Sequence, residues 1–251
     1  MGQKCGVCYM WDETIAKRGA NEVSSCLMDF IAFNVEKGVN NFVFWSDNCT
    51  GQNRNRFVYS SYIYASNRYK VSITHRFMEK GHTQNEGDSV HSTIENASRT
   101  KKVYTPNEWQ LLVRWARNST ESAYIVRNMQ QKDFYDFKQR LSDKVWIKNI
   151  RGEKVKWNNV KEVYVDVNEP NKLQYKYDLS AEEYEILVIT SNTRNSYNIN
   201  LTRAYSELLS IPLAKYNDLL SMCSTNVIPE EYHEYFKNLP HSLSNDETEE
   251  T

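Results

Sequence analysis

The sequence predicts an α/β protein, because short apolar runs typical of strands alternate with segments whose apolar residues recur at helical spacing. Residues 41–46 form a nearly continuous apolar run, which is typical of a strand buried on both faces. Residues 69–77 alternate apolar and polar side chains, which is typical of a strand with one buried face. With 251 residues, of which 40% are hydrophobic, the chain is long enough to bury a sizeable core.

Helical patterns lie between and beyond these strands. A short strand over residues 8–11 is expected to lead into an amphipathic helix over 20–33, with Asn21 as its cap. Helices over 53–67 and 86–98 complete a strand, helix, strand, helix order, which favours a largely parallel sheet with helices packed against it. Further helices are predicted over 107–117, 133–141, 213–223 and 230–239.

The pattern changes after Lys144, where short apolar runs surround a turn at Arg151 and Gly152 and predict a small antiparallel sheet. We therefore expect three parts. A first domain covers residues 1–142, a small β-rich module with C-terminal helices covers 143–243, and an acidic tail without fixed structure covers 244–251.

The composition excludes several classes of protein. The formal net charge is −1, so any nucleic-acid surface has to be a local patch. No run approaches 18 apolar residues and the first 20 residues lack a signal-peptide pattern, so we expect neither a membrane span nor secretion. The five cysteines, an odd number, suit free thiols in the nucleus or cytoplasm.

Asp47 is the first candidate functional residue. It follows the predicted strand 41–46, and the carboxyl ends of strands in α/β folds open into the crevice where ligands bind. A short polar side chain at this place can also cap the next helix or turn. The position alone leaves both interpretations open.

Three residues of the predicted helix 86–98 form a second candidate site. Asp88, His91 and Glu95 are spaced i, i+3 and i+7 and therefore lie on one helical face, opposite the apolar stripe. Oxygen and nitrogen ligands on one face suit a divalent cation, whereas a solvated polar face is the plainer interpretation. His82, in the loop just before the helix, is a further candidate ligand.

Mg²⁺ or Mn²⁺ is the expected cofactor and DNA the expected partner. Two carboxylates in a crevice repel each other unless a cation lies between them, and that cation could activate water or a DNA hydroxyl for attack on a phosphodiester. The βαβα order is expected to bring Asp47 and Asp88 to the same edge of the sheet, where they share the ion. The segment from Gln52 to Thr105 contains nine Lys and Arg residues and four acids. This surplus of five positive charges would attract phosphates. The candidate contacts are Arg54, Arg56, Lys101 and Lys102.

Two motifs carry a resemblance to a known family. Residues 45–55 read WSDNCTGQNRN, and residues 81–95 follow the pattern G-H-T-x4-D-x2-H-x3-E. At both places the chain resembles a large arthropod family of unknown function derived from DNA transposons. Shorter pieces agree near both ends, among them Trp11-Asp12-Glu13 and Ile211-Pro212, so the resemblance spans nearly the whole sequence.

The resemblance implies the ribonuclease-H-like fold of transposases, a mixed sheet with flanking helices and three catalytic acids. Asp47 matches the second acid, and Asp88 best matches the third, with Glu95 as its rival. The first acid would lie on a strand before Cys8, where only seven residues remain and none is acidic. The chain is therefore expected to be truncated at its N-terminus, with the first strands of the core missing.

The resemblance therefore implies a metal-dependent nuclease or strand-transfer domain whose catalysis is impaired by the missing acid. Asp12 and Glu13 are conceivable substitutes for that acid. The alternative function is a non-catalytic module that binds nucleic acid or protein. In that case basic residues after Lys144, beside Trp146 and Trp157, would contact a single strand, although ordinary sheet packing of these aromatic residues is the plainer interpretation.

Overall fold

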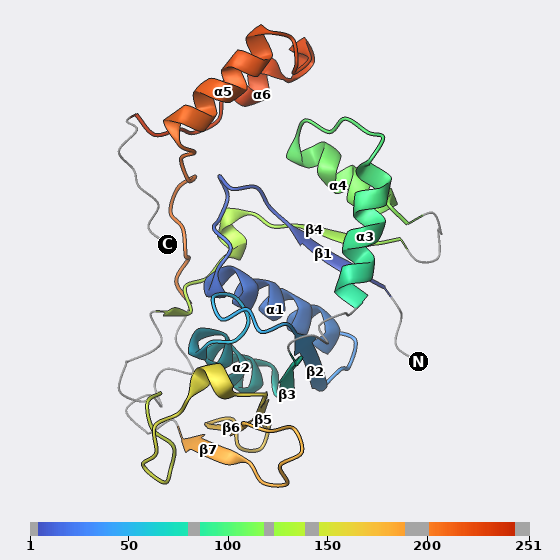
Figure 1. The fold of residues 1–251 in the computed structure, drawn as a ribbon. Coiled ribbons are helices and arrows are strands. Elements are labelled where there is room, and N and C mark those ends of the chain that lie inside the picture. Colours follow the sequence, from blue (N-terminus) through green and yellow to red (C-terminus); the bar gives the residue numbers. More distant parts are fainter. Residues whose placement is uncertain (1–4, 80–85, 118–122, 139–145, 189–200, 244–251) are drawn as a thin grey trace. The chain divides into compact units, whose positions relative to one another are not determined.

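The computed structural model describes residues 5–79, 86–117, 123–138, 146–188 and 201–243 (Figure 1). The chain forms two compact units, each assembled from stretches that are distant in the sequence. Unit 1 takes residues 1–17, 84–132 and 205–251, and unit 2 takes residues 18–83 and 133–204. No helix in the described part of the chain is long and apolar enough to cross a membrane.

Unit 2 is built on a five-stranded mixed sheet. Its strands are β2 (Asn41–Ser46), β3 (Ser72–Phe77), β5 (Glu162–Val165), β6 (Lys172–Lys176) and β7 (Glu185–Val188). They follow the order β2-β3-β5-β6-β7, in which β2 and β3 are parallel and the remaining pairs antiparallel. The predicted α/β class and the parallel pair are confirmed. Of the apolar runs predicted as strands after Lys144, the one at 163–165 lies in β5, whereas Trp146, Val155 and Trp157 lie outside strands. Strands β5, β6 and β7 extend this same sheet and do not form a separate one.

Helices α1 (Ala20–Val35) and α2 (Arg56–Tyr69) lie next to each other in unit 2 (Figure 1). The predicted cap of α1 is wrong, because Gly19 is the N-cap and its amide donates to Glu22 Oε2 at 2.7 Å. Asn21 lies within the first turn instead. Its side-chain amide donates to Asp136 at 3.2 Å and its oxygen accepts from the Phe137 amide at 2.9 Å, so it ties α1 to a distant segment.

That distant segment is not the helix predicted over residues 133–141. Among its described residues, a 3₁₀ turn ends at Asp133 and an extended stretch follows as far as Phe137, while residues 139–141 lie outside the described part. The backbone of this stretch pairs with residues 202–204, through bonds from the Asp136 amide to Thr202 and from the Ala204 amide to Phe134. Phe134 and Phe137, within this stretch, are both fully buried.

The core of unit 2 is rich in large aromatic side chains. The largest fully buried ones include Tyr59, Tyr62, Tyr175 and Phe77. Each such side chain contributes about 1.5–3 kcal/mol when it leaves water. The helices thus bury one face of β2, on which Phe44 meets Phe30 of α1 and Tyr62 of α2.

The other face of β2 corrects a prediction. Val43 is 54% exposed and Trp45 is 51% exposed, so β2 is not buried on both faces. The strand is the end strand of the sheet, and α1 and α2 pack on the face that carries Phe42 and Phe44. The continuous apolar run therefore does not indicate a second covered face.

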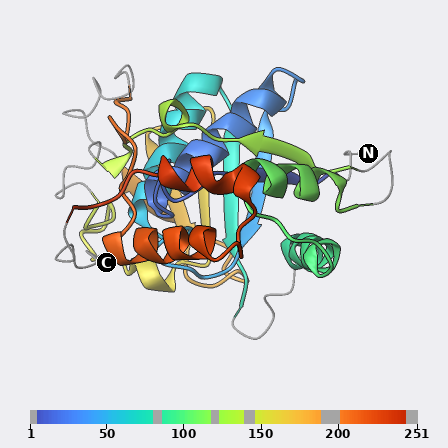
Figure 2. The same cartoon turned by 90° about the horizontal axis from the view of Figure 1, so that it is seen from above.

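Unit 1 contains a two-stranded parallel sheet and four α-helices among its described residues. Its elements are β1 (Val7–Met10), β4 (Ile125–Asn128), α3 (Glu86–Ser98), α4 (Pro106–Trp115), α5 (Leu213–Ser224) and α6 (His233–Lys237). Helix α4 contacts both α3 and β4, and α5 and α6 lie side by side (Figure 2). The acidic tail over 244–251 lies outside the described residues.

The start of α4 is fixed by a capping box. Thr105 is the N-cap, and its hydroxyl accepts from the Glu108 amide at 3.4 Å. Glu108 Oε2 accepts in return from the amides of Tyr104 and Thr105, and Pro106 provides the fixed φ suited to the first helical position. Glu108 Oε1 accepts from the hydroxyl of Tyr232 at 2.5 Å, which joins α4 to the C-terminal helices.

Candidate functional site

Asp47 lies at the carboxyl end of the parallel pair, immediately after β2. Its Oδ1 atom accepts hydrogen bonds from Asn53 Nδ2 at 2.8 Å and from the Cys49 amide at 3.2 Å. Oδ2 has no hydrogen-bond partner among the residues that the structure describes, and the side chain is exposed. Asp47 therefore orders the following turn with one oxygen, as the capping interpretation predicts, and a ligand at the other oxygen stays a prediction.

The loop that follows Asp47 is held by its own polar groups. The amides of Asn53 and Arg54 donate to the Cys49 carbonyl at 2.8 and 3.0 Å. Asn55 then caps α2, because its Oδ1 atom accepts from the amides of Phe57 and Val58. These hydrogen bonds fix the backbone of the loop on which Asp47 stands.

Arg54 is a structural part of this loop. The residue is only 7% exposed, and its guanidinium donates to Asn48 Oδ1 at 2.9 Å and to the Val160 carbonyl. It also lies 5.4 Å from the centre of the Phe77 ring. Because these donors face the protein interior, the position of Arg54 does not favour the predicted contact with DNA.

A buried histidine lies behind the end of β2. His75 is 3% exposed, with Nδ1 2.8 Å from the Tyr62 hydroxyl and Nε2 2.9 Å from Ser46 Oγ. Ser46 donates its own proton to the Asp47 carbonyl at 2.9 Å, so Nε2 is the nitrogen that donates to Ser46 and Nδ1 accepts from Tyr62. Burial lowers the pKa of His75 to about 3, against the opposing charge of Asp47.

The sequence carries a signal for the buried position of His75. The alternation along residues 69–77 places His75 on the same face as Ile73 and Phe77, which is the buried face of β3. A neutral imidazole bonded at both nitrogens is rigid. It therefore fixes the end of β2 and, through Ser46, the position from which Asp47 projects.

The second candidate site lies on α3, in unit 1. Asp88, His91 and Glu95 are all exposed, whereas the stripe of Val90, Ile94 and Ala97 is less exposed. The two predicted faces of this helix are therefore confirmed. Glu95 also lies 3.8 Å from Arg99 in an exposed ion pair. His82 lies outside the described residues.

Asp47 and Asp88 belong to different units, whose relative positions are not determined. A cation shared by their carboxylates therefore stays a prediction of the sequence. Among the residues that the structure describes, no group of three or more His, Cys, Asp or Glu side chains is arranged to hold a metal ion.

The basic stretch from Gln52 to Thr105 is divided between the two units. Arg56 stands at the start of α2 in unit 2, with its guanidinium 5.3 Å from the centre of the Phe57 ring. Lys101 and Lys102 follow α3 in unit 1, and both are exposed. Each unit therefore carries part of the charge that the sequence assigned to one surface.

The aromatic residues proposed for the alternative function lie in the core. Trp146 is 4% exposed, and Trp157 packs against Tyr59 and Tyr175 with ring centres 5.5 and 6.0 Å away. Trp157 also donates its indole proton to the Trp146 carbonyl at 3.0 Å. The two tryptophans therefore pack in the core of unit 2, and their faces are not open to a nucleic-acid base.

Comparison with known proteins identifies a family. The family model described as Domain of unknown function (DUF7869) matches residues 1–177, a range that includes Asp47, α3 and most of the unit 2 sheet. No curated protein and no solved structure matches the chain. Because the family model covers more than half of the sequence, the chain belongs to the DUF7869 family.

Proposed function

We propose that this chain is a DNA-processing domain of transposase descent, with a ribonuclease-H-like core and Asp47 as one of its metal-binding acids. The observation that carries the proposal is the open Oδ2 atom of Asp47 at the carboxyl end of a parallel strand pair. Ligand sites of α/β folds lie at such strand ends. A mixed sheet with flanking helices is also compatible with the fold class that the resemblance implies.

The carboxylate oxygen of Asp47 is a ligand of the type that the expected Mg²⁺ prefers. Proteins usually hold Mg²⁺ with one or two carboxylates, together with water and substrate phosphates, so the single open oxygen of Asp47 suits such an ion. When bound, the ion would polarise the phosphodiester and lower the pKa of the attacking water. Asp88, or Glu95 in its place, remains the second carboxylate expected from the sequence.

The surrounding residues contribute orientation. The bonds from Asn53 and Cys49 fix Oδ1, so that Oδ2 is already turned outward before a ligand arrives. Arg54 fixes the loop through its hydrogen bonds to Asn48 and the Val160 carbonyl. His75 binds Ser46 at the end of β2. These contacts keep the carboxylate in one geometry, which a charge placed to meet a phosphate-bound cation requires.

DNA binding that depends on both salt and metal tests this function. We expect the chain to shift DNA in a gel with an affinity that falls steeply with salt, and we expect Mn²⁺ or Mg²⁺ to strengthen binding by linking Asp47 to a phosphate. Asp47→Asn keeps an oxygen for the turn and removes the charge, so it should abolish the effect of the metal. Metal dependence that survives in this variant would exclude the proposed role of Asp47.

Asp166 provides a matched control. It also follows a strand, β5, and its Oδ1 atom accepts from the Asn168 amide at 2.7 Å and from Asn168 Nδ2 at 3.1 Å. Because β5 is antiparallel to β3, Asp166 lies at the opposite edge of the sheet from Asp47. Asp166→Asn should therefore retain the metal effect.

A nicking assay on supercoiled DNA separates the nuclease from a non-catalytic binding module. Metal-dependent nicking that Asp47→Asn abolishes and Asp166→Asn retains identifies a working catalytic centre. Binding without nicking identifies the impaired domain that the sequence predicts. Salt-insensitive binding, or none, would remove DNA as the partner.

A further inference from the structure

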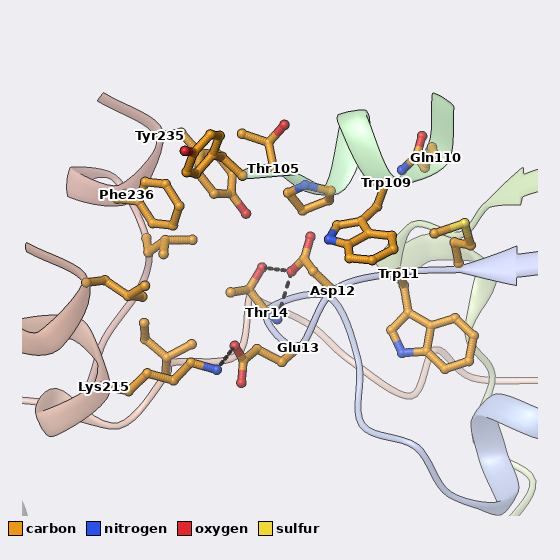
Figure 3. A pocket seen from close by; sticks show the side chains of 16 residues that line it. Trp11, Asp12, Glu13, Thr14, Thr105, Trp109, Gln110, Lys215, Tyr235 and Phe236 are labelled. Carbon is orange, nitrogen blue, oxygen red and sulfur yellow. Dashed lines mark hydrogen bonds and ion pairs between the residues drawn. The ribbon is translucent and has the colours of Figure 1, made fainter. Parts of the chain in front are cut away.

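A cavity of about 350 Å³ lies within unit 1 (Figure 3). Its walls come from the residues after β1, from the first turns of α4, and from α5 and α6. Five aromatic side chains line it, namely Trp11, Tyr104, Trp109, Tyr235 and Phe236. The volume falls at the lower end of the range of about 300–1,000 Å³ that is usual for small-molecule sites.

The charged residues of the cavity leave one negative charge uncompensated. Glu13 forms an ion pair with Lys215 at 2.5 Å, so these two charges cancel. Asp12 uses Oδ1 to accept from the amide and the hydroxyl of Thr14, at 2.9 and 2.5 Å. Its Oδ2 atom has no hydrogen-bond partner among the described residues, and Figure 3 shows it turned toward the space between Trp109 and Tyr235.

Tyr235 is affected by this charge. Burial, followed by the negative charges of Asp12 and Glu13, raises the pKa of its hydroxyl to about 12. Tyr235 is therefore neutral at physiological pH and keeps its ring as an uncharged wall. A phosphate or carboxylate ligand would meet an unfavourable potential here, because the cation of the lining, Lys215, is already paired.

We propose that this cavity binds a methylated ammonium group, carried by a dimethylated or trimethylated lysine or by a small quaternary amine. Aromatic faces attract such a cation through their quadrupoles, and its methyl groups gain by leaving water. Asp12 supplies the countercharge. This site is separate from Asp47 and does not depend on the proposed function.

The number of open acceptors favours a methylated cation over its unmodified relatives. An unmodified lysine ammonium has three donors and is strongly hydrated, whereas Asp12 offers one open anionic oxygen. A guanidinium prefers two carboxylate oxygens at once, and Oδ1 is already occupied by Thr14. A dimethylammonium group has one donor and a trimethylammonium group has none, so neither leaves a donor unpaired.

Isothermal titration of the full chain tests the proposal. The probes are one short peptide with its central lysine unmodified, dimethylated or trimethylated, and free choline. We expect the methylated peptides to bind at least about tenfold more tightly than the unmodified one, which corresponds to about 1.4 kcal/mol. If the methylated peptides bind tightly and choline does not, the ligand is a protein side chain. If choline binds as tightly as the methylated peptides, the ligand is a small amine.

Two variants and two matched controls make the test specific. Asp12→Asn, which keeps an oxygen for Thr14, and Trp109→Ala, at a site 40% exposed, should each weaken binding at least about tenfold. Asp218→Asn on α5 and Trp115→Ala on α4, which lie outside the cavity lining, should leave it unchanged. Equal affinity for all peptides, or unchanged affinity in Asp12→Asn, would overturn the proposal.

Discussion

His75 Nε2 lies 2.9 Å from Ser46 Oγ, so a buried neutral imidazole holds the residue immediately before Asp47. Its pKa falls from 6.5 to about 3 because the charged form is buried away from water. Between these two values the unfolded chain binds a proton that the folded chain does not, so stability rises with pH over this interval. The stabilising effect is complete above about pH 6.5 and is lost as the pH falls toward 3.

We therefore expect the free energy of unfolding to decrease by up to about 1.4 kcal/mol per pH unit below pH 6 through this residue. Urea denaturation at several pH values measures the slope. His75→Gln cannot bind the proton, so its stability should be lower at pH 7 and should change less between pH 6 and 4. An identical slope in the two proteins would show that the imidazole is charged, or accessible, in the folded state.

Arg54 and Arg56 should behave differently although they are two residues apart. Arg54→Ala leaves the buried Val160 carbonyl without its partner, so we expect a loss of about 1–3 kcal/mol in the free energy of unfolding. Arg56→Ala should change stability by less than about 0.5 kcal/mol. Urea denaturation measures both effects. Similar losses in the two variants would contradict the structural role of Arg54.

In the gel-shift series we expect the opposite ranking: Arg56→Ala should lose more DNA affinity than Arg54→Ala. Arg56→Ala should weaken binding and reduce its dependence on salt, because it removes a positive charge near the surface of the α2 start. A stability-neutral Arg56 variant with unchanged salt dependence would remove this residue from the DNA surface. Lys101→Ala and Lys102→Ala, which alter exposed side chains of unit 1, extend the same test to the other unit.

The bond between Tyr232 and Glu108 provides a test of the link between α4 and the C-terminal helices. This hydrogen bond is the largest of the causes that lower the pKa of Glu108. Tyr232→Phe removes the donor and should raise that pKa, as followed by ¹³C NMR of the carboxyl carbon. It should also lower the free energy of unfolding, because a hydrogen bond is lost. An unchanged Glu108 titration would mean that the hydroxyl does not bind the carboxylate in solution.

The sequence predicted those elements whose local pattern agrees with their environment. The bounds of β2 and α3 were found because the first is a compact apolar run and the second has an apolar stripe opposite a polar face. The exposure of Val43 and Trp45 was missed, since an apolar residue on a strand does not reveal whether anything covers it. Whether a strand lies at the end of a sheet depends on the whole fold, so the sequence of the strand alone does not show it.

The parts that could not be predicted depend on contacts between distant residues. Phe134 and Phe137 suit a helix by their spacing, but pairing with residues 202–204 extends this segment instead. The cavity likewise joins Asp12, Trp109 and Tyr235, which are separated by about a hundred residues at each step. Local periodicity carries no information about such contacts, so the sequence indicates Asp12 only as a substitute acid.

The measurement that tests the central claim most directly is a Mn²⁺ titration followed by NMR, because the paramagnetic ion broadens signals close to it. If Asp47 binds the ion, the amide signals of Cys49 and Asn53, which donate at or near its carboxylate, should broaden first. The signal of Asn168 beside Asp166 should remain sharp at the same concentration, and Asp47→Asn should abolish the early broadening. Equal broadening at Cys49 and Asn168, or broadening that persists in Asp47→Asn, would contradict the assignment of Asp47 as a metal ligand.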